Sequence, residues 1–146
     1  MEYKKLNGEI YLRIDPREEI LEKISEVSRR ERILGGHFQG IGYCTEITIS
    51  TFSPEDKKFS THDFSGHFEI LSLLGNVSCT QDLKLNIHAH ANFSYINEDK
   101  KITTFGGKIK KIFVDNTAEI ILTPANEIIQ QRFDIAEGFG VWQFKK

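Results

Sequence analysis

The stretch LNIHAHANF, residues 85–93, alternates between apolar and polar side chains along its whole length. Successive side chains of a β-strand point to opposite faces, so this pattern predicts a strand with one buried face. The other face then carries Asn86, His88, His90 and Asn92. Two histidines at this spacing lie roughly 6.5 to 7 Å apart at their Cα atoms and point the same way. The chain must therefore fold so that one face of this strand is covered and the histidine face stays polar.

Most of the remaining chain is also predicted to be strand. β-rich stretches occur at residues 8–15, 37–52, 58–64, 67–78, 102–114, 115–123, 127–133 and 139–144, with Ser65 and Gly66 as a tight connection. Residues 15–33 predict the one helix, with Asp15 as its N-cap and Glu18 completing a capping box. One helix and eight to ten strands predict a single α+β domain, residues 1–146, rich in antiparallel sheet.

The charge balance and cysteine content narrow the class of protein. The formal net charge is -2, whereas a dedicated nucleic-acid-binding domain usually has a basic balance. Two cysteines, Cys44 and Cys79, are too few for a disulfide framework and lack metal-finger spacing. The N-terminal residues show no secretory signal, and no apolar run reaches the ~18 residues of a membrane-spanning helix. We therefore expect a cytoplasmic protein with no membrane partner.

A series of short motifs resembles a known family. GHFEILSLLGNVS at 66–78, HAH at 88–90 and FGGK at 105–108 follow GGHFQGIGY at 35–43 and precede AEIIL at 118–122. In this order and spacing, over roughly residues 11–122, they resemble the PPC (plant- and prokaryote-conserved) domain family. The resemblance implies one helix packed on strongly bent, mostly antiparallel sheets, and assembly as a homotrimer. It also implies a fold similar to that of acetolactate decarboxylase, whose zinc is held by an H-x-H pair and a third histidine.

The polar face of residues 85–93 is a candidate zinc site, and the alternative is a strand face that is solvated or hydrogen-bonded. Two imidazoles on the same side of a strand can converge on one ion, and zinc accepts nitrogen ligands, so His88 and His90 are the first two candidates. The family pattern would take a third ligand from the histidine of a GGH motif, where this sequence has Lys108. An ammonium is a poor ligand and opposes the binding of a dication. In the family the motif that matches GGHFQGIGY approaches the same region, so the resemblance implies His37 as a candidate third ligand, with His62, His67 and Glu46 as further candidates.

Enzyme activity would require a metal with an open coordination position and a charged group that orients a substrate carboxylate. Lys108 could bind an anion, and Glu46 or Glu69 could act as an acid or base. The sequence assigns none of these roles, so no catalytic residue is predicted.

Nucleic acid is the second class of ligand. The candidate contacts are Lys108, Lys110 and Lys111 in GGKIKK, and the basic end of the predicted helix adds Arg29, Arg30 and Arg32. The Gly-Arg-Pro core of an AT-hook, which lays arginines in the minor groove, does not occur in the sequence. Binding of DNA by this chain alone is therefore expected to be weak, nonspecific and sensitive to salt.

Two functional hypotheses follow from these residues and from the resemblance. The first is a stand-alone, homotrimeric binding module associated with DNA or with DNA-binding partners. The alternative is a zinc-binding protein or a metal-dependent, decarboxylase-like enzyme with its site around His88 and His90.

Overall fold

A computed structural model describes residues 1–144 of the chain. It contains eight strands and one helix within that range. In chain order these are β1 (Glu2–Leu6), β2 (Glu9–Ile14), α1 (Ile20–Arg30), β3 (Gly36–Ser53), β4 (Lys58–Cys79), β5 (Leu85–Ile96), β6 (Ile102–Pro124), β7 (Gln131–Asp134) and β8 (Phe139–Trp142). Strand dominates, so the expected α+β class is only a coarse description of a mainly β fold with a single helix.

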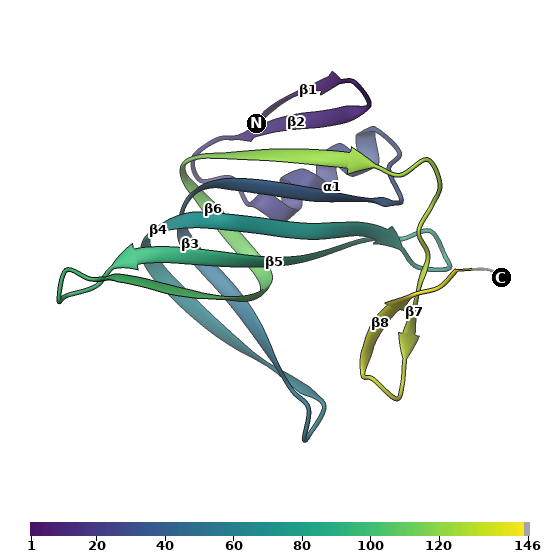
Figure 1. The fold of residues 1–146 in the computed structure, drawn as a ribbon. Coiled ribbons are helices and arrows are strands. Elements are labelled where there is room, and N and C mark those ends of the chain that lie inside the picture. Colours follow the sequence, from purple (N-terminus) through teal and green to yellow (C-terminus); the bar gives the residue numbers. More distant parts are fainter. Residues whose placement is uncertain (145–146) are drawn as a thin grey trace.

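The first six strands form one antiparallel sheet in the order β1-β2-β6-β3-β4-β5 (Figure 1). The first half of β6 also pairs with β5, from His90 opposite Lys108 to Ile96 opposite Ile102. Strands β3 to β6 therefore close on one another at one end, while β1 and β2 extend the sheet at the other. Strands β7 and β8 form a separate hairpin, which we call the C-terminal hairpin.

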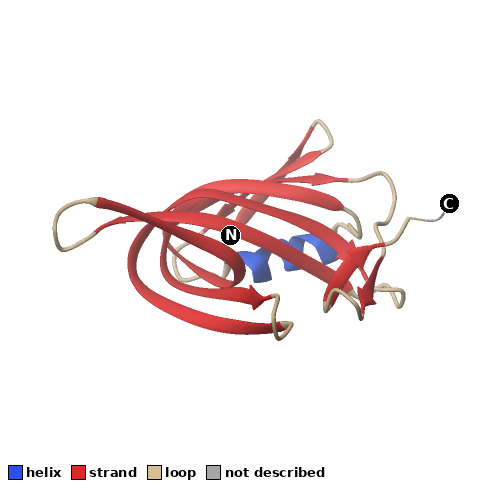
Figure 2. Cartoon of the chain, turned by 60° about the horizontal axis from the view of Figure 1, so that its bottom comes forward, coloured by secondary structure: helices blue, strands red, loops and turns tan. Residues whose placement is uncertain are grey.

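The sheet is strongly bent, as the resemblance implied, and the helix lies within its concave side (Figure 2). The register of β3 against β4 shifts between Gly40 and Gly42, and again between Cys44 and Glu46. Such bulges bend a strand and increase its twist. Glycine is required at Gly42, because a Cβ there would lie 2.6 Å from the Cα of Ala118 on β6. The glycines of β3 thus permit the close strand approach that the bend needs.

The core lies between the helix and the concave face of the sheet. The helix contributes Ile20, Ile24 and Val27, each with no exposed surface. Alternate residues of the strands complete it: Ile10, Leu12 and Ile14 from β2, Phe38 from β3, Leu73 and Val77 from β4, Ala89, Ala91 and Phe93 from β5, and Ala118, Ile120 and Leu122 from β6.

The helix begins four residues later than predicted. Glu18 does accept the backbone N–H of Asp15, at 2.9 Å, as a capping box requires, but the helix starts at Ile20 with Glu19 as its N-cap. The backbone N–H of Arg17 donates instead to the carbonyl of Val114 on β6, at 2.8 Å, and Arg17 has a φ of 69°. Bonding to β6 therefore replaces the first helical turn.

Two predicted strand breaks are wrong. Strand β4 runs without interruption through Ser65 and Gly66, because Ser65 pairs with Glu46 and Phe68 pairs with Cys44 on β3. The stretches 102–114 and 115–123 likewise form one strand, β6, which changes partners along its length. A pairing partner along the whole strand removes the need for a turn at these sites.

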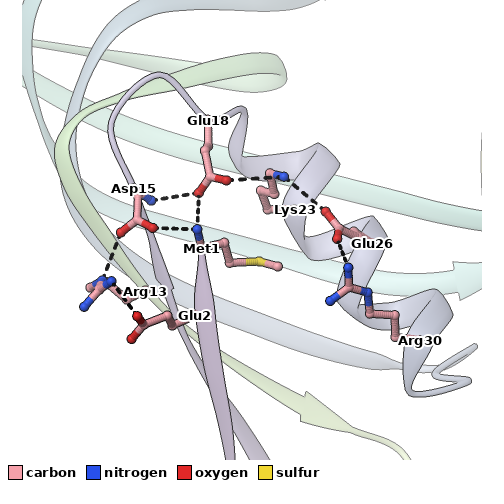
Figure 3. A network of polar contacts seen from close by, with 8 residues as sticks. All are labelled: Met1, Glu2, Arg13, Asp15, Glu18, Lys23, Glu26 and Arg30. Atoms are coloured by element: carbon pink, nitrogen blue, oxygen red, sulfur yellow. Dashed lines mark hydrogen bonds and ion pairs between the residues drawn. The ribbon is translucent and has the colours of Figure 1, made fainter.

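The N-terminal hairpin was not predicted. Strand β1 pairs with β2 through a two-residue turn at Asn7 and Gly8, both with positive φ. Asn-Gly is the strongest short-range signal for such a hairpin, so the sequence did contain this information. The hairpin brings the N-terminal ammonium to the carboxylates of Asp15 (2.5 Å) and Glu18 (2.8 Å), and Glu18 also contacts Lys23 on the helix (Figure 3).

Candidate ligand and metal site

Strand β5 carries the histidine pair as the alternation predicted. Ala89, Ala91 and Phe93 face the core and are 4% exposed or less, whereas His88 and His90 point to the opposite face. The flanking strands β4 and β6 hold β5 on both sides along its middle, so the direction of the two imidazoles is fixed by the sheet.

The two imidazoles lie against each other. Their Nε2 atoms are 3.1 Å apart and the ring centres are separated by 5.0 Å. Partial burial lowers the pKa of His88, and the charges of Lys108 and His90 lower it further. Burial and then Lys108 lower the pKa of His90 in the same way. Both rings therefore favour the neutral form, in which a ring nitrogen can accept a hydrogen bond or bind a metal.

Lys108 stands beside this pair, as the position of its motif suggested. It lies directly opposite His90 in the register of β5 and β6. Its Nζ is 4.5 Å from the centre of the Phe59 ring, over the face of that ring. Burial and the neighbouring charge of Lys110 lower the pKa of Lys108. The position that would supply a third imidazole therefore supplies a partly buried amine.

His37 reaches the same face of the sheet but is not a close neighbour of the pair. On β3 it lies opposite Asn76 of β4, and Asn76 lies opposite His88 of β5. The three histidines border one pocket of about 350 Å³. Within residues 1–144, no three His, Cys, Asp or Glu side chains form a group that could hold a metal ion. The structure thus brings the predicted trio to one pocket without assembling it into a coordination shell.

The alternative metal ligands lie elsewhere on the sheet. The Nε2 of His62 is 3.0 Å from the Thr51 hydroxyl on the β3–β4 hairpin. His67 contacts Asp115 at 3.0 Å, and Glu46 borders a different pocket with Asp63. None of these three lines the pocket of His37, His88 and His90.

The three lysines of the expected nucleic-acid contact do not form one basic surface. Lys108 is partly buried beside the histidines, whereas Lys110 and Lys111 are exposed. Lys111 borders a pocket together with the acidic residues Glu46 and Asp63. A polyanion approaching this part of β6 would meet both signs of charge.

Sequence reasoning missed a second cavity at the histidine pair. A pocket of about 480 Å³ is bordered by His88, His90 and Lys108 and by aromatic side chains of two hairpins. Phe52 and Phe59 come from the β3–β4 hairpin and Phe139 from the C-terminal hairpin. Only tertiary structure brings these segments together, although the pairing of Phe52 with Phe59 could be expected once the turn at residues 54–57 is placed. We call this cavity the aromatic pocket.

The family assignment rests on most of the chain. The model of the Plants and Prokaryotes Conserved (PCC) domain matches residues 1–126. The chain belongs to this family. It is the family expected from the motifs, which is also abbreviated PPC. The C-terminal hairpin lies beyond the matched residues. No curated protein sequence matches the chain.

Solved structures show the same fold over nearly the whole chain. A candidate DNA-binding protein from Bacteroides thetaiotaomicron has a TM-score of 0.90 at 23% identity, covering 99% of this chain and 98% of its own. A metal-containing protein from Archaeoglobus fulgidus has a TM-score of 0.82 at 25% identity, covering 99% of both chains. A PPC protein from Pyrococcus horikoshii has a TM-score of 0.79 at 27% identity, covering 99% and 95%.

The expected likeness to acetolactate decarboxylase is also found, at a greater distance. A Staphylococcus aureus protein of unknown function, similar to alpha-acetolactate decarboxylase, has a TM-score of 0.55 at 10% identity. It is matched over 89% of this chain and 56% of its own, which shows a shared fold alone.

In the part of the chain that the structure describes, no helix has the length and apolarity to cross a membrane.

Proposed function

We propose that this PCC-domain protein is a cytoplasmic, homotrimeric binding module that associates with DNA or with DNA-binding partners. The observation that carries the proposal is the apolar convex face of the sheet, opposite the helix. Ile41 and Leu74 are each 58% exposed, and Leu71 and Tyr11 are 44% and 40% exposed. These side chains border a broad hollow of about 760 Å³. Contiguous apolar surface of this kind is typical of an interface between proteins.

Another copy of the same chain fits this face better than a partner whose surface carries charges of only one sign. The hollow is also bordered by Arg13 and Lys4 and by Glu2 and Glu119, so both signs of charge surround the apolar side chains. A surface with both signs can pair with a second copy of the same chain. Closed rings of identical chains also cover exposed sheet edges, such as that of β1, which heads the strand order.

The association with DNA comes from the Bacteroides neighbour, which is described as a candidate DNA-binding protein. The scattered lysines and the net charge of -2 favour contact through a DNA-binding partner over strong binding by this chain itself. Direct binding should therefore be weak and should be lost by about 200 mM salt.

Light scattering after size exclusion tests the assembly. We expect a mass of three times the chain mass of 16.8 kDa at micromolar concentration. Ile41→Asp should give monomers, whereas Ile102→Asp, at an exposed isoleucine at the start of β6, should leave the trimer intact. A monomeric parent protein would overturn the homotrimer. A gel shift with DNA that survives about 200 mM salt would overturn the dependence on a partner.

A second candidate is a zinc site on His88 and His90, favoured by the 3.1 Å separation of their Nε2 atoms. Neutral imidazoles at this separation suit two positions of a tetrahedral zinc ion. The likeness to the metal-containing Archaeoglobus protein supports the same reading. Elemental analysis of protein purified without a tag or chelator should find zinc. Metal-free protein that gains no thermal stability from added zinc would contradict this candidate, and with it the decarboxylase-like enzyme that would depend on the metal.

A further inference from the structure

The aromatic pocket has a polar end and an apolar end. At the polar end, a row of residues crosses three strands, with His90 of β5 opposite Lys108 of β6 and Lys108 opposite Ser50 of β3. At the apolar end lie the rings of Phe59 and Phe139. The cavity, at about 480 Å³, is within the size range of small-molecule sites.

The apolar end is built by contacts between the two hairpins. Phe52 packs against Phe59, with ring centres 5.0 Å apart, and against Phe139, with centres 5.8 Å apart. Lys57 donates a hydrogen bond to the carbonyl of Ala136 at 2.5 Å. The C-terminal hairpin is therefore held against the β3–β4 hairpin before any ligand binds.

The same hairpin is also fixed to the strand that carries the histidines. Asn86 of β5 donates a hydrogen bond to the side-chain carbonyl of Gln131 at 3.2 Å, and both residues border the pocket. The pocket wall formed by the C-terminal hairpin thus has contacts to two separate parts of the sheet.

The polar end has hydrogen-bonding groups that the protein does not satisfy. Ser50 is 3% exposed, and within residues 1–144 its Oγ has no hydrogen-bond partner. In the same range no carboxylate lies within ion-pair distance of Lys108, whose ammonium lies over the Phe59 ring. A partly buried cation and a buried hydroxyl without a partner both carry a free-energy cost that a bound acceptor would remove.

We propose that the aromatic pocket binds a small organic anion whose carboxylate or phosphate group is attached to a planar apolar body. Lys108 pairs with the anionic group, and the Ser50 hydroxyl donates a hydrogen bond to it. The planar body lies against Phe59 and Phe139. The pocket shares no bordering residue with the hollow assigned to assembly, so the inference does not depend on the proposed trimer. Both lie on the same face of the sheet, where Leu74 is directly opposite His90.

Titration calorimetry and NMR with four probes test the proposal on chelator-treated protein. Phenylacetate and phenyl phosphate combine the two features, inorganic phosphate has only the charge, and benzyl alcohol has only the ring. We expect one or both aromatic anions to bind at least tenfold more tightly than inorganic phosphate or benzyl alcohol. The better of the two distinguishes a carboxylate site from a phosphate site.

Matched variants locate the binding. Lys108→Met keeps the apolar stem on Phe59 and removes the charge, and it should weaken binding of the aromatic anion at least tenfold. Lys110→Met, on the same strand but exposed and outside the pocket, should weaken binding by less than about threefold. Ser50→Ala provides a second, conservative variant in case Lys108→Met does not fold, and it should weaken binding severalfold.

Three results would overturn the proposal. The first is that neither aromatic anion binds at concentrations up to about 10 mM, which is well above the dissociation constant expected even for a small fragment. The second is equal affinity of the parent protein and Lys108→Met, or an equal loss in Lys110→Met. The third is binding that appears only after zinc is added, because a metal on His88 and His90 would then carry the anion.

Discussion

His90 on β5 and Lys108 on β6 are direct cross-strand neighbours, and their side chains share one end of the aromatic pocket. Lys108 takes the place at which the family resemblance led us to expect a third histidine. The proposed zinc site and the proposed anion site therefore make opposite demands on this one side chain. Replacement of Lys108 is the most direct way to separate the two.

Lys108→His should increase zinc affinity at least tenfold over the parent protein. The change removes a positive charge beside the ion and adds an imidazole opposite His90. Competition with a chromogenic chelator measures the affinity, and Lys110→His serves as the control because Lys110 is exposed and does not border the pocket. An unchanged affinity in Lys108→His would show that the histidine pair is not the start of a metal site.

Both histidines should titrate below their ordinary pKa of 6.5 in NMR experiments, since burial and Lys108 favour the neutral rings. Their contribution to stability is full above pH 6.5 and is lost as the pH falls through the folded-state pKa values. Lys108→Met should raise both pKa values without restoring them fully, because burial is the larger cause. Titration of both rings at or above 6.5 in the parent protein would contradict this account.

Glu19→Ala should lower the free energy of unfolding by about 2–4 kcal/mol. The buried Glu19 carboxylate accepts the backbone N–H of Glu22 at 2.6 Å, as the helix N-cap, and that of Ile112 on β6 at 2.9 Å. Alanine leaves both groups unpaired, whereas Glu19→Gln keeps one acceptor and should lose roughly half as much. Urea denaturation measures the difference, and equal losses in the two variants would rule out this double role.

Gly75→Ala should destabilise the fold by about 1–3 kcal/mol, the usual cost of overpacking a core. A Cβ at Gly75 would lie 2.1 Å from the Cζ of the buried Phe38 ring. Combined with Phe38→Leu, the same change should cost less than the sum of the two single variants, because leucine vacates the space. Strictly additive losses in thermal or urea unfolding would show that the ring does not restrict position 75.

Local sequence rules do not predict the first residue of the helix correctly. Asp15, Pro16 and Glu18 satisfy the rules for a helix N-terminus, and the Glu18–Asp15 contact does form. The Arg17 N–H nevertheless donates to the Val114 carbonyl, and the Val114 N–H donates to the Glu18 carbonyl, so the helix starts only at Ile20. Those bonds depend on β6, almost a hundred residues later, and local propensity carries no information about them.

The sequence by itself determined the faces of the strands. The alternation in residues 85–93 placed Ala89, Ala91 and Phe93 in the core and both histidines outside it, because the side-chain period of a strand is local. The family motifs likewise placed Lys108 beside the pair. Only the tertiary structure decided that strand β4, with Asn76, separates His37 from the pair, and that Ser50, Phe59 and Phe139 border the same pocket as Lys108. Strand pairing and hairpin packing join residues far apart in the chain, so no local pattern can specify them.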